Sequence, residues 1–257
     1  MSIATIFKKK SLVTGLALAG AMLTASASQA ANWSSTSLVM HNGSGYKTVP
    51  GNEEYDQSIL TLEHVSGWNY GKNFFFIDVS EQNNPESSFY GEYSPSLSLS
   101  KLSGSDMSFG FVKDVSLAGT WEFGGITNAK LAGLTFDLDI PGVPVASVSL
   151  YNRFGESKFA PGELSSAPQV TLVWMAPFAL GSTNWVFEGF LDYAWEEKEV
   201  GKVANTIAAP RLWLDTGALW GAPKQFYTGI EYQYWNNKYG VDGVDEGVPQ
   251  ISAKWTF

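Results

Sequence analysis

The stretch Ile251-Ser252-Ala253-Lys254-Trp255-Thr256-Phe257 alternates between apolar or small residues and polar residues over its whole length. Successive side chains of a β-strand point to opposite faces of its sheet, so this alternation predicts a strand with one apolar and one polar face. The stretch Leu134–Ile140 repeats the pattern, because large apolar residues alternate there with Thr135, Asp137 and Asp139. The chain is therefore predicted to be all-β.

Segments of this kind, bounded by turn residues, recur about twelve times between residues 31 and 257, and each is about as long as a tilted strand that spans a bilayer. Connections expected after odd strands, such as His41–Gln57 and Gly155–Pro168, are longer than most connections after even strands, such as Pro141–Pro144. This asymmetry is typical of extracellular loops and periplasmic turns. We predict an antiparallel transmembrane β-barrel of about 12 strands; a soluble lipocalin-like barrel or β-sandwich is the alternative. A terminal aromatic such as Phe257 resembles the closing strand of bacterial outer-membrane barrels.

The first 30 residues have the pattern of a secretory signal peptide. A basic segment, Lys8–Lys10, precedes an apolar segment, Leu12–Leu23, and a small-x-small cleavage site, Ser28-Gln29-Ala30. The alternative is an amphipathic N-terminal helix. We expect residues 1–30 to be a signal peptide and residues 31–257 to form the barrel.

Composition narrows the possible partners. Aromatic residues make up 14% of the chain, with 10 Trp and 11 Tyr, and such rings gather at membrane interfaces. Without Lys8–Lys10 the chain has 13 basic and 25 acidic residues, a net charge of about −12 (13 − 25), which makes nucleic acid an unsuitable partner. There is no Cys, which excludes disulfides and thiolate chemistry. We expect outer-membrane lipid as a partner and no cofactor.

Particular residues resemble a known family. The block Leu62-Glu63-His64-Val65-Ser66-Gly67-Trp68 is followed by Asn73-Phe74-Phe75-Phe76-Ile77-Asp78 and by Phe89-Tyr90-Gly91-Glu92-Tyr93-Ser94-Pro95. In order and spacing these blocks resemble the Tsx-type nucleoside channels and the related OmpK proteins. The resemblance covers about Trp33 to Phe257 and implies a monomeric, twelve-stranded outer-membrane barrel in a Gram-negative bacterium, with a narrow channel that admits nucleosides.

A nucleoside channel needs aromatic faces for the base and carboxylates or amides for the ribose hydroxyls. Because Asp78 is costly in lipid and shares a strand face with Phe74 and Phe76, we expect all three to point inward; the reverse register is the alternative. The same argument turns Glu63, Glu92, Glu122, Asp137, Glu188, Asp192, Arg211, Glu231 and Lys254 inward. Asp78, Glu92, Asp192 and Arg211 are expected toward the extracellular half, and Glu231 near mid-barrel with Trp235 above it. The predicted substrate-binding residues are Phe74, Phe76, Asp78, Tyr90, Glu92, Asp192, Arg211, Glu231 and Trp235.

No pattern predicts catalysis or a metal site. The two histidines are His41, expected at the start of the first long loop, and His64, expected within a strand. There is no Gly-x-Ser-x-Gly elbow and no metal-spaced cluster, and Asp242, Asp245 and Glu246 are interpreted as solvated turn residues. We predict an outer-membrane channel for passive diffusion of nucleosides or similar small polar solutes, and not an enzyme. The alternative is a barrel for adhesion or surface binding through the loops Gly155–Pro168 and Asn237–Gly247, of the phage- or bacteriocin-receptor type, with little conductance.

Overall fold

A computed structural model describes residues 31–82, 89–159 and 162–257. The expected signal peptide lies outside the described residues. The strands are β1 (Trp33–Lys47), β2 (Glu54–Trp68), β3 (Gly71–Gln82), β4 (Phe89–Ser98), β5 (Val112–Gly124), β6 (Thr127–Leu138), β7 (Val145–Ser157), β8 (Glu163–Leu180), β9 (Thr183–Ala194), β10 (Asn205–Ala208), β11 (Arg211–Leu214), β12 (Phe226–Asn236) and β13 (Glu246–Thr256). The short helices are α2 (Leu99–Ser103), η1 (Lys198–Val200), η2 (Gly217–Trp220) and η3 (Lys238–Gly240).

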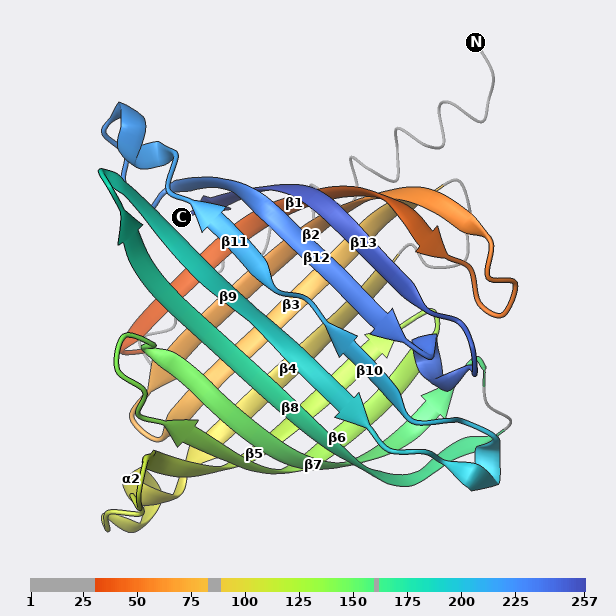
Figure 1. Ribbon diagram of the computed structural model, residues 1–257. Coiled ribbons are helices and arrows are strands. Elements are labelled where there is room, and N and C mark those ends of the chain that lie inside the picture. The colour runs from red at the N-terminus through yellow and green to blue at the C-terminus, as the bar shows by residue number, and fades with distance from the viewer. Residues whose placement is uncertain (1–30, 83–88, 160–161) are drawn as a thin grey trace.

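The strands form one antiparallel sheet that closes into a barrel where β1 pairs with β13 (Figure 1). Thirteen strands occupy twelve positions, because β10 and β11 each pair with both β9 and β12. The predicted twelve-stranded barrel is therefore confirmed. Closure leaves no free sheet edge, so the strands satisfy one another's backbone groups, as a hydrocarbon environment requires.

The break between β10 and β11 falls at Ala209 and Pro210. Proline has no N–H to donate to a neighbouring strand, so it interrupts the ladder. The flanking contacts persist, since Ala209 N donates to Phe190 O (3.1 Å) and Tyr232 N donates to Pro210 O (3.0 Å). The wall is continuous here although the strand is not.

Polar and apolar side chains are distributed in the opposite way to a soluble protein. On β13, Ile251 is 77% exposed, whereas its neighbours Gln250 and Ser252 are 1% and 3% exposed. On the paired strand β12, Ile230 is 58% exposed and Glu231 only 5%. Apolar side chains thus cover the outside and polar side chains fill the inside, the pattern of a barrel whose outer wall contacts lipid. This excludes the lipocalin-like alternative.

The two ends of the barrel differ from the predicted loop asymmetry. We call the end where β1 begins and β13 ends, with α2, the terminus end (at the left in Figure 1), and the opposite end the loop end. At the loop end β1 extends to Lys47 and β2 starts at Glu54, so most of the expected loop His41–Gln57 is strand. At the terminus end, by contrast, the residues after β4 form the short helix α2, and β5 begins only at Val112. No helix among the described residues is long and apolar enough to span a membrane.

Candidate functional site: the barrel interior

An aromatic row runs along the inner face of β3 and β4. Phe74 and Phe76 lie two residues apart on β3, and their ring centroids are 6.0 Å apart. Tyr90 on β4 continues the row at 5.8 Å from Phe76. Phe76 lies opposite Glu63 of β2 in the strand register, and Glu63 binds across the interior, so the row faces inward.

Carboxylates lie beside this row. Asp78 accepts a hydrogen bond from Thr61 Oγ1 at 2.6 Å, and Glu92 accepts one from the Tyr90 hydroxyl at 2.6 Å. Asp192 lies on the inner face of β9, opposite Thr171 of β8 and Ile207 of β10 in the strand register. The acids expected near the aromatic row are therefore brought close to it by neighbouring strands, with Asp192 farther around the wall.

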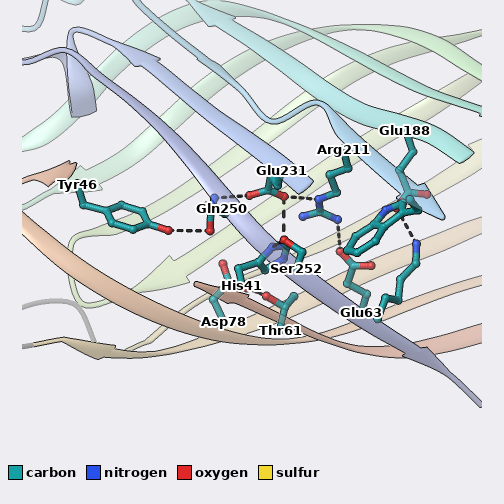
Figure 2. Close-up of polar contacts among 12 residues, drawn as sticks. His41, Tyr46, Thr61, Glu63, Asp78, Glu188, Arg211, Glu231, Gln250 and Ser252 are labelled. Carbon is teal, nitrogen blue, oxygen red and sulfur yellow. Dashed lines mark hydrogen bonds and ion pairs between the residues drawn. The ribbon is translucent and has the colours of Figure 1, made fainter. Parts of the chain in front are cut away.

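Arg211 bridges the interior (Figure 2). Its Nε donates to Glu231 Oε2 on the adjacent strand, and its Nη1 donates to Glu63 Oε1 on β2 at 2.5 Å. Because β12, β13 and β1 lie between β11 and β2, the second bond crosses a chord of the barrel. Arg211 and Glu231 are direct register partners on adjacent strands, so they lie at similar depths along the barrel axis. The expectation that Arg211 lies nearer the extracellular end than Glu231 was wrong.

The bridge continues toward the loop end through uncharged partners. Gln250 Nε2 donates to Glu231 Oε1 at 2.7 Å, and the Tyr46 hydroxyl donates to Gln250 Oε1 at 2.7 Å (Figure 2). Tyr46 and Gln250 are each 1% exposed. A continuous chain of polar contacts therefore leads from Tyr46 to Glu63 through the interior.

His41 lies beside this bridge, in the middle of β1. The prediction that it lies at the start of a loop was wrong. Its Nδ1 is 2.7 Å from Ser252 Oγ, and its Nε2 is 4.0 Å from Glu231 Oε2. The other histidine, His64, lies on the opposite face of the wall, where it stacks on Phe75 at 5.2 Å. The two histidines are separated by the barrel wall, so they cannot act in one catalytic site.

Trp213 fills the interior on the same side and is completely buried. Its Nε1 donates to Glu188 Oε1 (2.7 Å), which also accepts from Lys254 Nζ (2.7 Å). The indole fits because its register partner is Gly229; a Cβ there would lie 2.7 Å from the Trp213 ring. The Trp213 contacts were not predicted, although the two-residue period of a strand places Trp213 on the same face as Arg211.

A second arginine lies on the other wall. Arg153 of β7 makes a bidentate ion pair with Glu122 of β5 (2.8 and 2.5 Å) and also donates to Gln169 Oε1 at 2.9 Å. Glu122 was expected to point inward, but Arg153 was not identified. Arg153 lies near the end of an expected strand, in Tyr151-Asn152-Arg153, and only the alternation of strand faces indicated that it points inward. The Arg153 pair lies along the wall, because only β6 separates β5 from β7.

The loop end is covered by the connection between β12 and β13. Lys238 Nζ is 2.8 Å from Glu246 Oε2, and Tyr239 packs on Trp235 at 4.5 Å and on Phe159 at 5.4 Å. Glu246, expected to be a solvated turn residue, is 4% exposed. Burial lowers the pKa of Lys238 below its ordinary value. Trp235, predicted to lie above Glu231, is the residue on which this cover packs.

The terminus-end half of the interior is more open. Lys72 of β3 reaches Asp137 of β6 at 2.6 Å, but the Lys72 side chain remains 45% exposed. Phe74 is 38% exposed although it faces inward. The interior therefore consists of an open half, with the start of the aromatic row, and a half filled by the Arg211 bridge and the loop-end cover. The described residues contain no group of three or more His, Cys, Asp or Glu that could hold a metal ion.

A protein-family model described as "Nucleoside-specific channel-forming protein, Tsx" matches residues 30–256. The chain belongs to this family. Two curated relatives of this Tsx-family barrel are both named Outer membrane protein OmpK. One, from Vibrio parahaemolyticus, is 23% identical over 175 residues, which cover 65% of this chain and 63% of the relative. The other, from Vibrio parahaemolyticus serotype O3:K6 (strain RIMD 2210633), is 24% identical over 165 residues, covering 60% and 58%. The chain thus spans less than two thirds of the length of these relatives.

Among solved structures, the NanC porin matches with 12% identity and a TM-score of 0.51, over 86% of this chain and 98% of that chain. The KdgM porin matches with 11% identity and a TM-score of 0.47, over 87% and 99%. The NanC match supports the fold alone. The family and the names of the curated relatives place this Tsx-family barrel in the outer membrane of a Gram-negative bacterium.

Proposed function

We propose that the barrel passes nucleosides or similar small polar solutes by passive diffusion, as a monomer, along the row Phe74, Phe76 and Tyr90. The observation that carries this proposal is the row itself. Its rings follow one another at 6.0 and 5.8 Å on the inner wall, and a base stacked on one ring can move to the next. Stacking is tolerant of base identity, because every base has a π-face.

The carboxylates supply the second half of nucleoside recognition. Glu92 and Asp78 flank the row, and a ribose carries adjacent hydroxyls that donate to carboxylate oxygens. Both acids already accept one hydrogen bond from the protein, and each has remaining acceptor capacity. A solute is therefore held by several weak contacts, which permits both entry and release.

The adhesion alternative has less support from the described surface. Most of the expected loop Gly155–Pro168 is strand, since β7 extends to Ser157 and β8 begins at Glu163. The other expected binding loop, Asn237–Gly247, buries Lys238 and Gly240.

The test is single-channel recording in planar bilayers with adenosine as the blocking solute. Wild-type protein is expected to show conductance steps that adenosine reduces. In Phe74→Leu/Phe76→Leu, which keeps the apolar volume and removes the π-faces, the adenosine concentration for half block is expected to rise roughly tenfold or more.

Phe75→Leu is the matched control, because Phe75 lies on the same strand and faces outward. This control is expected to leave the block unchanged, and heat-modifiable migration on gels verifies folding of every variant. A wild-type barrel without conductance steps would favour the adhesion function. Equal adenosine block in the double variant and the wild type would contradict the role of the row.

A further inference from the structure

The ammonium group of Lys238 lies in a site built by four other parts of the chain. Its Nζ is 2.8 Å from Glu246 Oε2 of β13 and donates to the backbone oxygen of Lys47 at the end of β1 (3.1 Å). Three aromatic rings surround it, with centroids at 5.3 Å (Trp235), 5.9 Å (Tyr239) and 6.0 Å (Tyr55). A carboxylate, a carbonyl oxygen and ring faces together form the arrangement that recognises an organic ammonium ion.

The segment that carries Lys238 has a backbone that needs such contacts. Asn237 and Tyr239, on either side of Lys238, both have left-handed conformations, with φ of 50° and 58°. Residues other than glycine adopt this backbone conformation at a cost in conformational free energy, and it persists where surrounding contacts hold it. Glu246 is anchored independently, because Lys47 N and Gln233 Nε2 donate to it at 2.7 and 2.6 Å. The carboxylate is therefore a fixed point to which the segment is attached.

The same segment reaches the far side of the mouth. Tyr239 packs on Phe159 from the connection between β7 and β8, and Gly240 O accepts from Val203 N of the connection between β9 and β10 (3.0 Å). In the closed barrel, β9 to β12 lie between β8 and β13, so the segment crosses a wide part of the opening. When Lys238 occupies its site, the segment covers the loop end.

We propose that the loop end contains a binding site for a primary ammonium ion, occupied by the side chain of Lys238, and that this occupancy holds the segment Asn237–Asp245 across the channel mouth. A solute enters when Lys238 leaves the site. This inference rests on the proposed channel function only where electrical conductance is measured. The position of the segment Asn237–Asp245 is measured separately, by proteolysis.

The main variant is Lys238→Ala, which leaves Glu246 without its counter-ion and vacates the space of the lysine side chain. Chymotrypsin cleaves after aromatic residues, and Tyr239 is held between Trp235 and Phe159. Loss of one partner of a buried ion pair is expected to make cleavage after Tyr239 roughly 10²-fold faster, followed by mass spectrometry. The single-channel conductance is expected to rise in the same variant.

Chemical rescue distinguishes a binding site from a general loosening. Propylammonium replaces the missing side chain with its charge, and propanol replaces it without the charge. Propylammonium is expected to restore both the protection of Tyr239 and the wild-type conductance of Lys238→Ala, whereas propanol at the same concentration is not. Equal effects of the two compounds, or no effect of either, would overturn the ammonium site.

Two further variants keep the test decisive. In Lys238→Met/Glu246→Gln both charges are removed, so no carboxylate is left unpaired, but no ammonium group occupies the site; we expect cleavage after Tyr239 to stay fast, and protection equal to that in wild type would show that the ammonium group is not what holds the segment. Lys198→Ala is the control, since Lys198 is an exposed lysine of a neighbouring connection that pairs with Glu196 at the surface (3.0 Å). Protection of Tyr239 in folded Lys238→Ala equal to that in wild type would disprove the proposal, even if the barrel conducts. Faster cleavage after Tyr239 in Lys238→Ala, combined with no conductance steps in any variant or in wild type, would support the ammonium site and contradict the channel function.

Discussion

Arg211 and Arg153 are both inward-facing arginines that bind glutamates, yet they do different things to the bore. Arg211 binds Glu231 on the adjacent strand β12 and Glu63 on β2, which β12, β13 and β1 separate from β11. Arg153 pairs with one carboxylate two positions away, along the wall. An inward arginine that binds a carboxylate on a distant strand divides the interior. An inward arginine that binds a carboxylate on a nearby strand stays along the wall. Partner position, and not residue type, decides whether an inward charge obstructs a channel.

The charge balance of the two sites differs as well. Arg211 is directly matched by Glu63 and Glu231, and Lys254 by Glu188. On the Arg153 wall, Glu122 pairs with Arg153, Glu92 accepts from the Tyr90 hydroxyl, and Asp192 lies opposite Thr171 of β8. The Arg153 wall therefore has three acidic side chains for its one arginine, and their oxygens can accept hydrogen bonds from hydroxyl donors.

The largest effect is expected for Arg211→Met. This variant leaves Glu63 and Glu231 buried without their cation, and breaking a buried ion pair in this way costs about 3 to 5 kcal/mol of unfolding free energy. The single-channel conductance should rise, because the bridge is gone. Denaturant unfolding in detergent and bilayer recording measure the two effects. A folded variant with wild-type conductance would show that the bridge does not limit the bore.

A smaller effect is expected for Arg153→Met. Only Glu122 is left without its cation, one buried carboxylate instead of two, so we expect a loss of unfolding free energy near the lower end of the about 3 to 5 kcal/mol that breaking a buried ion pair costs. The conductance should change little, since this pair lies along the wall, but the preference for K⁺ over Cl⁻ should increase as one positive charge is lost. Reversal potentials in a KCl gradient measure it. If Arg153→Met widens the bore as much as Arg211→Met, the contrast between the two arginines fails.

The smallest effect is expected for Glu63→Gln. The amide keeps an oxygen that accepts from Arg211, and Arg211 retains Glu231, so we expect a loss of about 1 kcal/mol in unfolding free energy and an unchanged conductance. Together with Arg211→Met and the corresponding double variant, this substitution forms a cycle that measures the coupling across the bore. A coupling near zero would mean that Arg211 is held by Glu231 alone.

Alternation in the sequence was sufficient to predict the class of fold and the face of most strand residues. A two-residue period assigns Ile251 and Trp255 to one side and Ser252 and Lys254 to the other, and the cost of charge in lipid decides which side is inside. Strand ends were harder to predict. The Leu-Ser alternation continues past Ser98 into Leu99 and Ser100, but Ser98 caps α2 there by accepting from Lys101 N (3.1 Å).

The interior contacts depend on information that no local pattern contains. The inward direction of Glu63, Arg211 and Glu231 follows from local sequence, because strand parity and the cost of charge in lipid act within each strand. The contact of Arg211 with Glu63, 148 residues away, and the position of His41 beside their bridge depend on how distant strands pair in three dimensions. Register and stagger between strands set the depth of each inward side chain, and they arise from pairing around the whole closed barrel.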